Sequence, residues 1–379
     1  MNRRLAPPAI ADSWGNDASF QLPVSSDAYL ALISHLNHYS MLKHLSAVLT
    51  GAPKPTVSRL SQNIHTKSAM STSAVDRANE FVAYLNASIT PFHAVKNAAA
   101  LLEEAGFQLI RERDSWSSTL KPGQKYYFTR NGSTIAAFAI GKKWKAGNPL
   151  AMVGTHTDSP VLRIKPVSKK QADGFLQVGV EAYGGGLWHT WFDRDLSVAG
   201  RVMVQEGDTI VQKLVKVERP IMRIPTLAPH LDRTQEFAFN KETQLFPITG
   251  LVQAELNRQG NGSTQQQDKE KNSDASSTSP IKAVSERHHP YLVDVIAEEA
   301  GCDPAAIVDF EMILYDTQKS CLGGLNNEFI FSPRLDNLTM TYCGVAAIIK
   351  SLESDAALED DATIRVLACF DHEVSMMTT

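Results

Sequence analysis

The sequence has few cysteines and no long apolar run. Its 379 residues include four cysteines, which all lie after residue 300 and form no C-x-x-C pair. This distribution gives no disulfide framework and is typical of a reduced, cytoplasmic protein. No apolar stretch approaches the length of a membrane-spanning helix, so we expect no membrane partner.

The sequence also lacks an excess of either charge. It has 37 Lys and Arg against 41 Asp and Glu, which gives a formal net charge of −4. This balance gives no electrostatic reason to expect nucleic acid or an anionic membrane as a partner. The hydrophobic fraction of 43% is that of a globular protein, and the length suffices for two domains.

Residues 1–72 do not have the pattern of a compact α/β domain, because Ser, Pro and Ala are abundant in them. Within them, residues 26–49 carry apolar side chains at helical spacing and predict an amphipathic helix. This helix is a targeting segment or an interaction helix, unless Met70 is the true start of translation. We expect the extension to be partly disordered.

From residue 73 onward the pattern becomes regular. It predicts a helix over 74–85 and a second helix that starts at Pro91 and ends near Gly106. Two β-rich runs joined at Asn131 and Gly132 predict a hairpin. These elements form the first part of an expected α/β domain.

Between residues 161 and 288 the texture changes to short alternating β runs, which predict an inserted β-rich domain that serves as a lid or an assembly module. Within it, residues 257–285 are almost purely polar and predict a disordered loop. Helix, strand, helix and strand then follow, over 290–300, 307–315, 337–352 and 364–370. The first domain is therefore expected to be discontinuous, with residues 73–160 and 289–379.

One predicted strand ends abruptly in polar residues. Residues 150–154 are apolar or small, which predicts a strand buried on both faces, and His156 and Asp158 follow it. Ligands of open α/β sheets bind at the carboxyl ends of such strands. In an extended run His156 and Asp158 project to the same side, so the carboxylate can bond one ring nitrogen and leave the other for a divalent metal. The alternative is a polar loop with a capping Asp.

Two further acidic residues have two interpretations each. Asp336 stands at the mouth of a predicted helix, where it is either an N-cap, which the local sequence favours, or a metal ligand. Glu373 follows the last predicted strand and is either a solvated terminus or a general base. The glycines of Gly184–Gly186 lack the spacing of a phosphate loop, so tight backbone packing is their expected use.

Five motifs in a fixed order carry a resemblance: GTHTDSP, EAYGGGLWHTWFDRDL, LAPHLDR, FIFSPRLDNL and ACFDHE. Together they closely resemble the aspartyl aminopeptidase family of metallopeptidases, peptidase family M18, over residues 74–373. The resemblance implies an α/β catalytic domain of the zinc-peptidase type, with a central mixed sheet flanked by helices and an inserted β-rich domain. It also implies two zinc ions per subunit and a homo-oligomer, a dodecamer.

The same resemblance implies a zinc metalloaminopeptidase that removes N-terminal residues, with Asp or Glu expected, from peptide substrates. Residue by residue, His156 matches a metal ligand, Asp158 its orienting carboxylate and Asp336 the carboxylate that bridges the two metals. Glu373 matches the general base, and His230 of the LAPHLDR motif matches a substrate-contacting histidine.

The sequence departs from the family at its last residues. The family motif Asp-x-Glu-Glu-Val-Gly-Ser is replaced by Asp-His-Glu-Val-Ser over residues 371–375, so the second Glu, a metal ligand, is absent. Further Asp and His ligands are also absent, and we expect a C-terminally truncated chain. Because Val-Ser can be encoded by GTNAGT, which matches an intron donor site, we hypothesise a retained intron or a faulty gene model, with chance as the alternative. A mature transcript whose reading frame ends after Thr379 would contradict this hypothesis.

These departures leave a second function open. The chain is then a catalytically inactive subunit that assembles with complete subunits or travels with them as cargo. The N-terminal extension suits that role, since fungal vacuolar members of the family carry one, and the vacuole is the alternative to the cytoplasm as location.

Overall fold

The structure is a computed structural model that describes residues 73–228, 230–231, 238–262, 283–354 and 356–373. The chain divides into two units, residues 1–69 and 70–379, and every described residue belongs to the second. The amphipathic helix predicted over 26–49 therefore lies outside the described residues. Among the described helices, none has the length and apolar character that crossing a membrane requires.

The first two described helices begin at the residues that the sequence predicts, and each has an N-cap side chain. At α3 (Ala74–Ala87), the Ser73 hydroxyl accepts the backbone N–H of Asp76, whose carboxylate accepts the N–H of Ser73. At α4 (Pro91–Glu104) the Thr90 hydroxyl accepts the backbone N–H of His93, and Pro91 occupies the first helical position. The other helical segments are η1 (Trp188–Trp191), α5 (Val252–Gly262), α6 (Val284–Arg287), α7 (Pro290–Ala300), η2 (Pro304–Ala306) and α8 (Leu335–Lys350).

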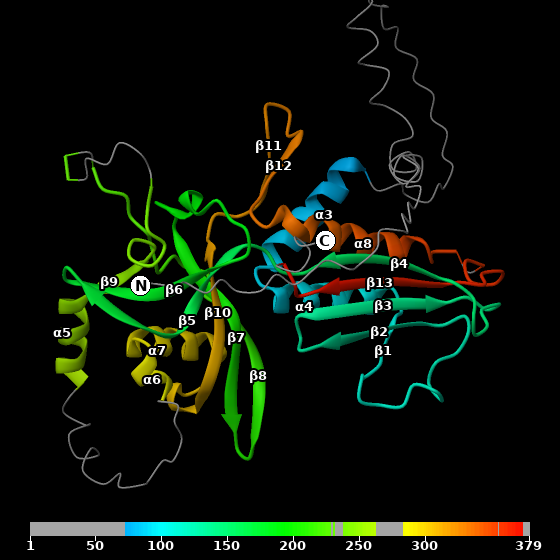
Figure 1. Ribbon diagram of the computed structural model, residues 1–379, viewed down its shortest axis with the longest axis horizontal. Helices are drawn as coiled ribbons and strands as arrows, with labels where there is room; N and C mark the ends of the chain where they lie inside the picture. Colours follow the sequence, from blue (N-terminus) through cyan, green and yellow to red (C-terminus); the bar gives the residue numbers. More distant parts are fainter. Residues whose placement is uncertain (1–72, 229, 232–237, 263–282, 355, 374–379) are drawn as a thin grey trace, which may run out of the picture. The chain divides into compact units, whose positions relative to one another are not determined.

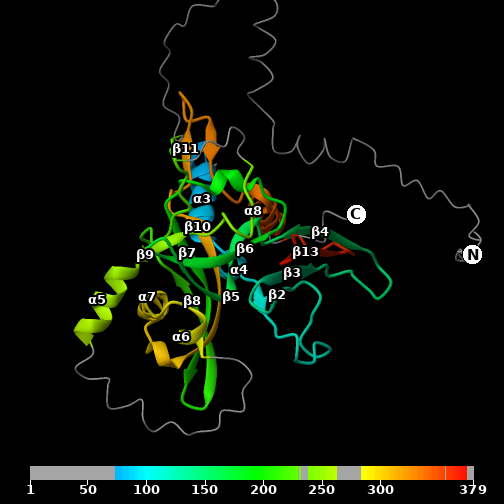
Figure 2. The same cartoon turned by 60° about the vertical axis from the view of Figure 1, so that its left-hand side comes forward.

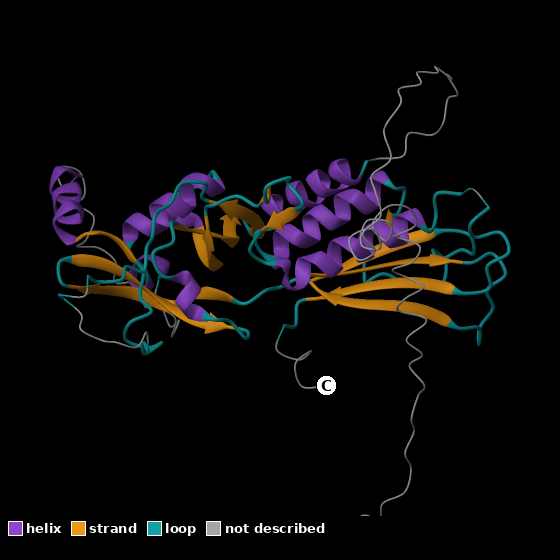
Figure 3. Cartoon of the chain, turned by 90° about the horizontal axis from the view of Figure 1, so that it is seen from above, coloured by secondary structure: helices purple, strands orange, loops and turns teal. Residues whose placement is uncertain are grey.

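One sheet has five strands and carries α3, α4 and α8 on one face, as Figures 1 and 3 show. It is mixed, because β13 runs parallel to β4 and antiparallel to β3. Buried apolar side chains of α4, α8 and β13 form the core between helices and sheet. This mixed α/β architecture confirms the predicted fold class. In order across the sheet, the strands are β1 (Gln108–Leu109), β2 (Lys125–Arg130), β3 (Thr134–Ile140), β13 (Ile364–Phe370) and β4 (Leu150–His156).

A second, six-stranded sheet is entirely antiparallel and encloses the largest cluster of buried apolar residues together with α7. It corresponds to the predicted β-rich segment. In order across the sheet, its strands are β8 (Thr209–Lys216), β7 (Leu196–Glu206), β10 (Ile307–Asp316), β5 (Val161–Ala172), β6 (Phe175–Tyr183) and β9 (Ile248–Leu251).

The placement of β10 differs from the predicted domain boundary at residue 289. The strand exists where the sequence predicts it, but it pairs with β7 along nearly its whole length and with β5 on the other side. Helix α7 packs on the same sheet. The second sheet therefore includes residues up to 316, beyond the predicted boundary at 289, because a strand belongs to the sheet whose strands it pairs with.

The expectation that residues 150–154 are buried on both faces is wrong. Among the described residues β4 pairs only with β13, so it is an edge strand. Leu150, Met152 and Val153 are 59%, 63% and 51% exposed. Only the last two residues of the strand, Thr155 and His156, are buried.

The prediction of a disordered loop over 257–285 is wrong at both of its ends, where helices are present. The middle of the predicted loop, 263–282, lies outside the described residues. Helix α5 continues to Gly262, and α6 begins at Val284. The side chain of Arg258 in α5 pairs with Glu255 and Asp294. Ion pairs thus support a polar helix that buries little apolar surface.

A short hairpin of β11 (Cys321–Gly323) and β12 (Phe329–Phe331) links the second sheet to α8. In Figures 1 and 2 it stands away from both sheets. Its apolar side chains Leu325, Phe329 and Phe331 are exposed.

Candidate metal centre

The site lies where the parallel strands β4 and β13 end side by side. Their register pairs Phe370 with His156, so the polar residues that follow the two strands meet at the carboxyl ends of these strands. The N–H of Thr157 donates to the carbonyl of Phe370 at 2.8 Å, which continues the pairing by one residue. The sequence pattern of an apolar strand followed by polar residues predicted that polar side chains follow these strand ends, and the structure has them there.

Helix α8 brings Asp336 to the same place. The Thr341 hydroxyl, one turn into the helix, donates to the carbonyl of His156 at 2.8 Å. The Ser159 hydroxyl donates to the carbonyl of Asp336 at 2.6 Å. These two bonds tie the first turn of α8 to the loop after β4.

The capping role that local sequence favoured for Asp336 is wrong. The residue before the helix is Arg334, no side-chain hydrogen bond caps this end, and the backbone at Asp336 is non-helical. The carboxylate of Asp336 is 75% exposed, and its Oδ1 lies 3.3 Å from His156 Nε2.

Three side chains converge within metal-binding distance. One ligand atom each of His156, Asp336 and Glu373 lie within 4.8 Å of one another, a group found by searching the described residues. His156 and Glu373 are buried, and Oε2 of Glu373 has no hydrogen-bond partner. A buried carboxylate oxygen without a donor, next to an imidazole and a second carboxylate, fits a divalent cation such as zinc.

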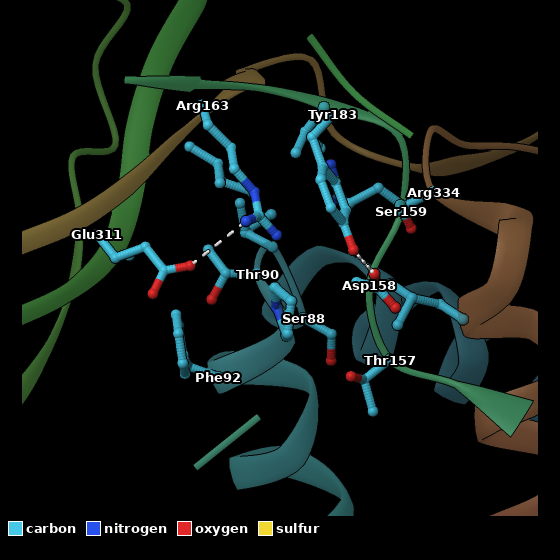
Figure 4. Close-up of a pocket in the computed structure, with 16 residues that line it drawn as sticks. Ser88, Thr90, Phe92, Thr157, Asp158, Ser159, Arg163, Tyr183, Glu311 and Arg334 are labelled. Atoms are coloured by element: carbon cyan, nitrogen blue, oxygen red, sulfur yellow. Dashed lines mark hydrogen bonds and ion pairs between the residues drawn. The ribbon is translucent and has the colours of Figure 1, made fainter. Parts of the chain in front are cut away.

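Asp158 orients this group. His156 Nδ1 lies 3.0 Å from the backbone carbonyl oxygen of Asp158 and 3.4 Å from its Oδ1, which leaves Nε2 directed at Asp336. The backbone N–H groups of His372 and Glu373 donate to its two oxygens at 3.0 and 2.7 Å. The Tyr183 hydroxyl also donates to it, as Figure 4 shows. The carbonyl and the fixed carboxylate of Asp158 together favour a proton on Nδ1 and orient the imidazole for metal binding through Nε2.

Burial and neighbouring charges act differently on the two buried acids. Burial would raise the pKa of Asp158, but the hydrogen bonds from His156, Tyr183 and Glu373 outweigh it and lower that pKa. Burial raises the pKa of Glu373, and the negative charges of Asp336 and Asp158 add to the effect against the opposing His156. Asp158 is therefore held ionised, while Glu373 takes up a proton more readily than an ordinary carboxylate.

His230 is not part of the ligand group found among the described residues. It occupies an exposed turn in which the N–H of Leu231 donates to the carbonyl of Ala228. Across the described ranges, no contact joins it to His156, Asp336 or Glu373. Its role as a substrate contact stays a prediction.

Two further residues at the site, Tyr183 and Gly184, were not predicted to lie there. Both belong to the glycine-containing run noted above, where tight packing was expected. Gly184 has φ +77°, and a Cβ there would lie 2.9 Å from Glu373 Cγ. The tight packing is thus confirmed, and it occurs against the candidate site itself.

A groove of about 480 Å³ opens beside Asp336. One wall comes from the segment around Gly186 and Trp191, and the other from Tyr315 and Phe331. Its size suits a peptide end, and it leads to the exposed carboxylate of Asp336.

The chain is similar to known zinc metalloproteases and aminopeptidases. Residues 84–375 match the family described as aminopeptidase I zinc metalloprotease (M18). The chain is 64% identical over 299 residues to an aspartyl aminopeptidase of Aspergillus oryzae, covering 78% of this chain and 60% of that protein. It is 49% identical to aspartyl aminopeptidase 1 of Schizosaccharomyces pombe, covering 80% of this chain and 62% of that protein. The chain thus spans about three-fifths of the length of these curated relatives.

Solved structures of related aminopeptidases resemble the fold of this chain. A cryo-EM structure of the Ape4 and Nbr1 complex matches with a TM-score of 0.69 and 48% identity, over 82% of this chain and 57% of that one. A structure of the S. cerevisiae mApe1 dodecamer matches with a TM-score of 0.64 and 28% identity, over 80% and 62%.

Proposed function

The chain belongs to the M18 family of zinc metalloproteases, and from this premise we propose that it forms the catalytic site of an aminopeptidase that removes N-terminal acidic residues from peptides. The observation that carries the proposal is the convergence of His156, Asp336 and Glu373 at the ends of β4 and β13. The relatives named aspartyl aminopeptidase support the acidic substrate.

In this proposal His156 and Asp336 hold zinc, and Asp158 orients His156. Zinc supplies a Lewis acid that polarises the scissile carbonyl and lowers the pKa of water. Since Glu373 is kept as the base, His156 and Asp336 supply two ligands, and we propose that further ligands beyond these residues complete the zinc coordination and hold a second ion.

Glu373 is the proposed general base. Its raised pKa suits a group that accepts a proton from the attacking water and returns it to the leaving amine. The groove beside Asp336 would receive the N-terminal residue, and His230 is kept as a proposed substrate contact.

We further propose a homo-oligomer, since one solved relative is described as a dodecamer. The cytoplasm is the proposed location, with the vacuole as the alternative. All four cysteines are free thiols, which supports a reducing compartment. Light scattering of the purified chain would give the subunit number.

Release of Asp from a peptide with N-terminal Asp, followed by mass spectrometry on the zinc-loaded full chain, tests the activity. We expect hydrolysis, and a fall of about 10²- to 10⁴-fold for Glu373→Gln, because general acid–base catalysis contributes that much. Zinc content should stay unchanged in this variant if Glu373 is the base, and should drop if it is a ligand.

The matched control is Glu353→Gln, at an exposed Glu after α8. It should hydrolyse the peptide like the parent chain. A folded, zinc-loaded chain that releases no Asp would contradict the proposed activity, and equal rates in Glu373→Gln and the parent would contradict the proposed base.

A further inference from the structure

Tyr183 joins the second sheet to the candidate metal centre. It is the last residue of β6, whereas Asp158 follows β4 of the first sheet. Its hydroxyl donates to Oδ2 of Asp158 (Figure 4). The same oxygen accepts the N–H of Glu373. This bond is therefore a side-chain link from the second sheet to the acid that orients His156.

The phenol ring of Tyr183 is itself held in place. The guanidinium of Arg163 lies over the ring, 3.6 Å from its centroid. Arg163 faces Glu311 of β10 at 3.9 Å, and Arg201 of β7 pairs with the same carboxylate at 3.1 Å. A cation over an aromatic face is attractive, and the charge pairs restrict its movement. Neighbouring strands of the second sheet thus fix the ring that meets Asp158.

The end of β6 meets the centre at a second point. Gly184 packs directly against the Glu373 side chain, where a Cβ would approach Cγ to 2.9 Å. A cavity of about 20 Å³, large enough for one water, has Asp158, Arg163, Tyr183 and Glu311 among its lining residues. The end of β6 therefore contacts both Asp158 and Glu373.

We propose that Tyr183 is a positioning residue through which the second sheet sets the Asp158 carboxylate, and thereby the His156 ring, for metal binding. This inference rests on the proposed function, because it presupposes that His156 binds zinc. Without the hydroxyl, Asp158 Oδ2 keeps only the N–H of Glu373 as a donor, so the carboxylate is held less firmly beside His156 Nδ1. Outer partners of metal-ligating histidines typically contribute about 10- to 100-fold to metal affinity.

The test is the zinc dissociation constant of the full chain, measured by competition with a chromophoric chelator. Tyr183→Phe removes the hydroxyl and keeps the ring under Arg163. The matched control is Tyr127→Phe, because the Tyr127 hydroxyl also donates to a carboxylate, that of Glu103, within the first sheet and its helix. We expect zinc affinity to weaken about 10- to 100-fold in Tyr183→Phe and to stay within about twofold of the parent in Tyr127→Phe.

Thermal unfolding separates positioning from simple stabilisation. Each variant loses one hydrogen bond to a carboxylate, so both should lower the melting temperature slightly. Parent-like zinc affinity in Tyr183→Phe would overturn the inference and leave the proposed metal site standing. A folded parent chain that binds no zinc would overturn both, and a parent that binds zinc without releasing Asp would contradict only the proposed activity.

Discussion

At the scale of single residues, His288 is a buried imidazole away from the metal centre. Its Nδ1 lies 2.8 Å from the Ser168 hydroxyl, and its ring packs on Phe310. Burial lowers the pKa of His288 to about 4, and the positive charge of Arg287 adds to that effect. Asp309 opposes it, and His289 adds slightly to the lowering. The folded chain therefore keeps this ring neutral.

This burial predicts a loss of stability in mild acid. The unfolded chain binds a proton at His288 below about pH 6.5, whereas the folded chain does so only near its lowered pKa. The free energy of unfolding should therefore decrease as pH falls through that window, by up to about 1.4 kcal/mol per pH unit for this residue. Urea unfolding of the parent and of His288→Gln at about pH 8 and about pH 5 measures it.

We expect His288→Gln to be the less stable chain at the higher pH and to lose less stability on acidification. His93, whose pKa burial also lowers to about 4, keeps part of the dependence in both chains. Equal losses in the two chains would show that His288 does not carry the effect.

The residues of the metal centre show what sequence can and cannot reveal at this scale. The spacing of His156 and Asp158 places them on one side of an extended run, and the structure agrees. The position of Asp336 in the metal-binding group could not be predicted from its neighbouring residues, because an Asp at the start of a helix is usually a cap. Its partner His156 lies far away in the sequence and only the fold brings it within 3.3 Å.

At the scale of elements, the contact between β7 and β10 depends on Gly200. A Cβ at this position would lie 1.9 Å from the carbonyl oxygen of Glu311 in the neighbouring strand. Gly200→Ala must therefore push the strands apart, and we expect the free energy of unfolding to fall by at least about 2 kcal/mol. Denaturant unfolding measures this change, with the zinc affinity as a second readout because Glu311 anchors Arg163.

Gly250→Ala is the control within the same sheet. A Cβ there would meet only Leu176, at an ordinary 3.5 Å. We expect a change of less than about 1 kcal/mol, since Ala loses less backbone entropy than Gly on folding. Equal stability of the two variants would contradict the close approach of β7 to β10.

Element existence was predictable here, and element partnership was not. Helix α7 and strand β13 occur at the predicted residues because apolar spacing and a terminal Gly301 are local signals. Strand β10 carries the same kind of pattern, yet its sheet is fixed by pairing with strands over a hundred residues earlier in the chain. A run of apolar residues indicates that a strand is present and buries side chains, but it does not indicate which other strand pairs with it.

At the scale of the whole molecule, the described chain leaves an apolar sheet edge in solvent. Leu150, Met152 and Val153 of β4 are exposed, and Phe370 at the end of the adjacent strand is 46% exposed. The sequence predicted the apolar character of this strand and could not predict its position at the edge, because both buried and edge strands can be apolar.

An exposed apolar edge strand pairs readily with other chains, so we expect concentration-dependent, open-ended association of the purified protein. Met152→Lys places a charge on this edge, and static light scattering should show a clear reduction in large species. Val75→Lys is the matched control, because Val75 is similarly exposed, at 59% against 63%, but lies on α3 and not on a sheet edge. A discrete oligomer of the proposed kind should persist in both variants, since open-ended pairing is the process that the charge opposes. Scattering from Met152→Lys as strong as that from Val75→Lys would place the association elsewhere on the molecule.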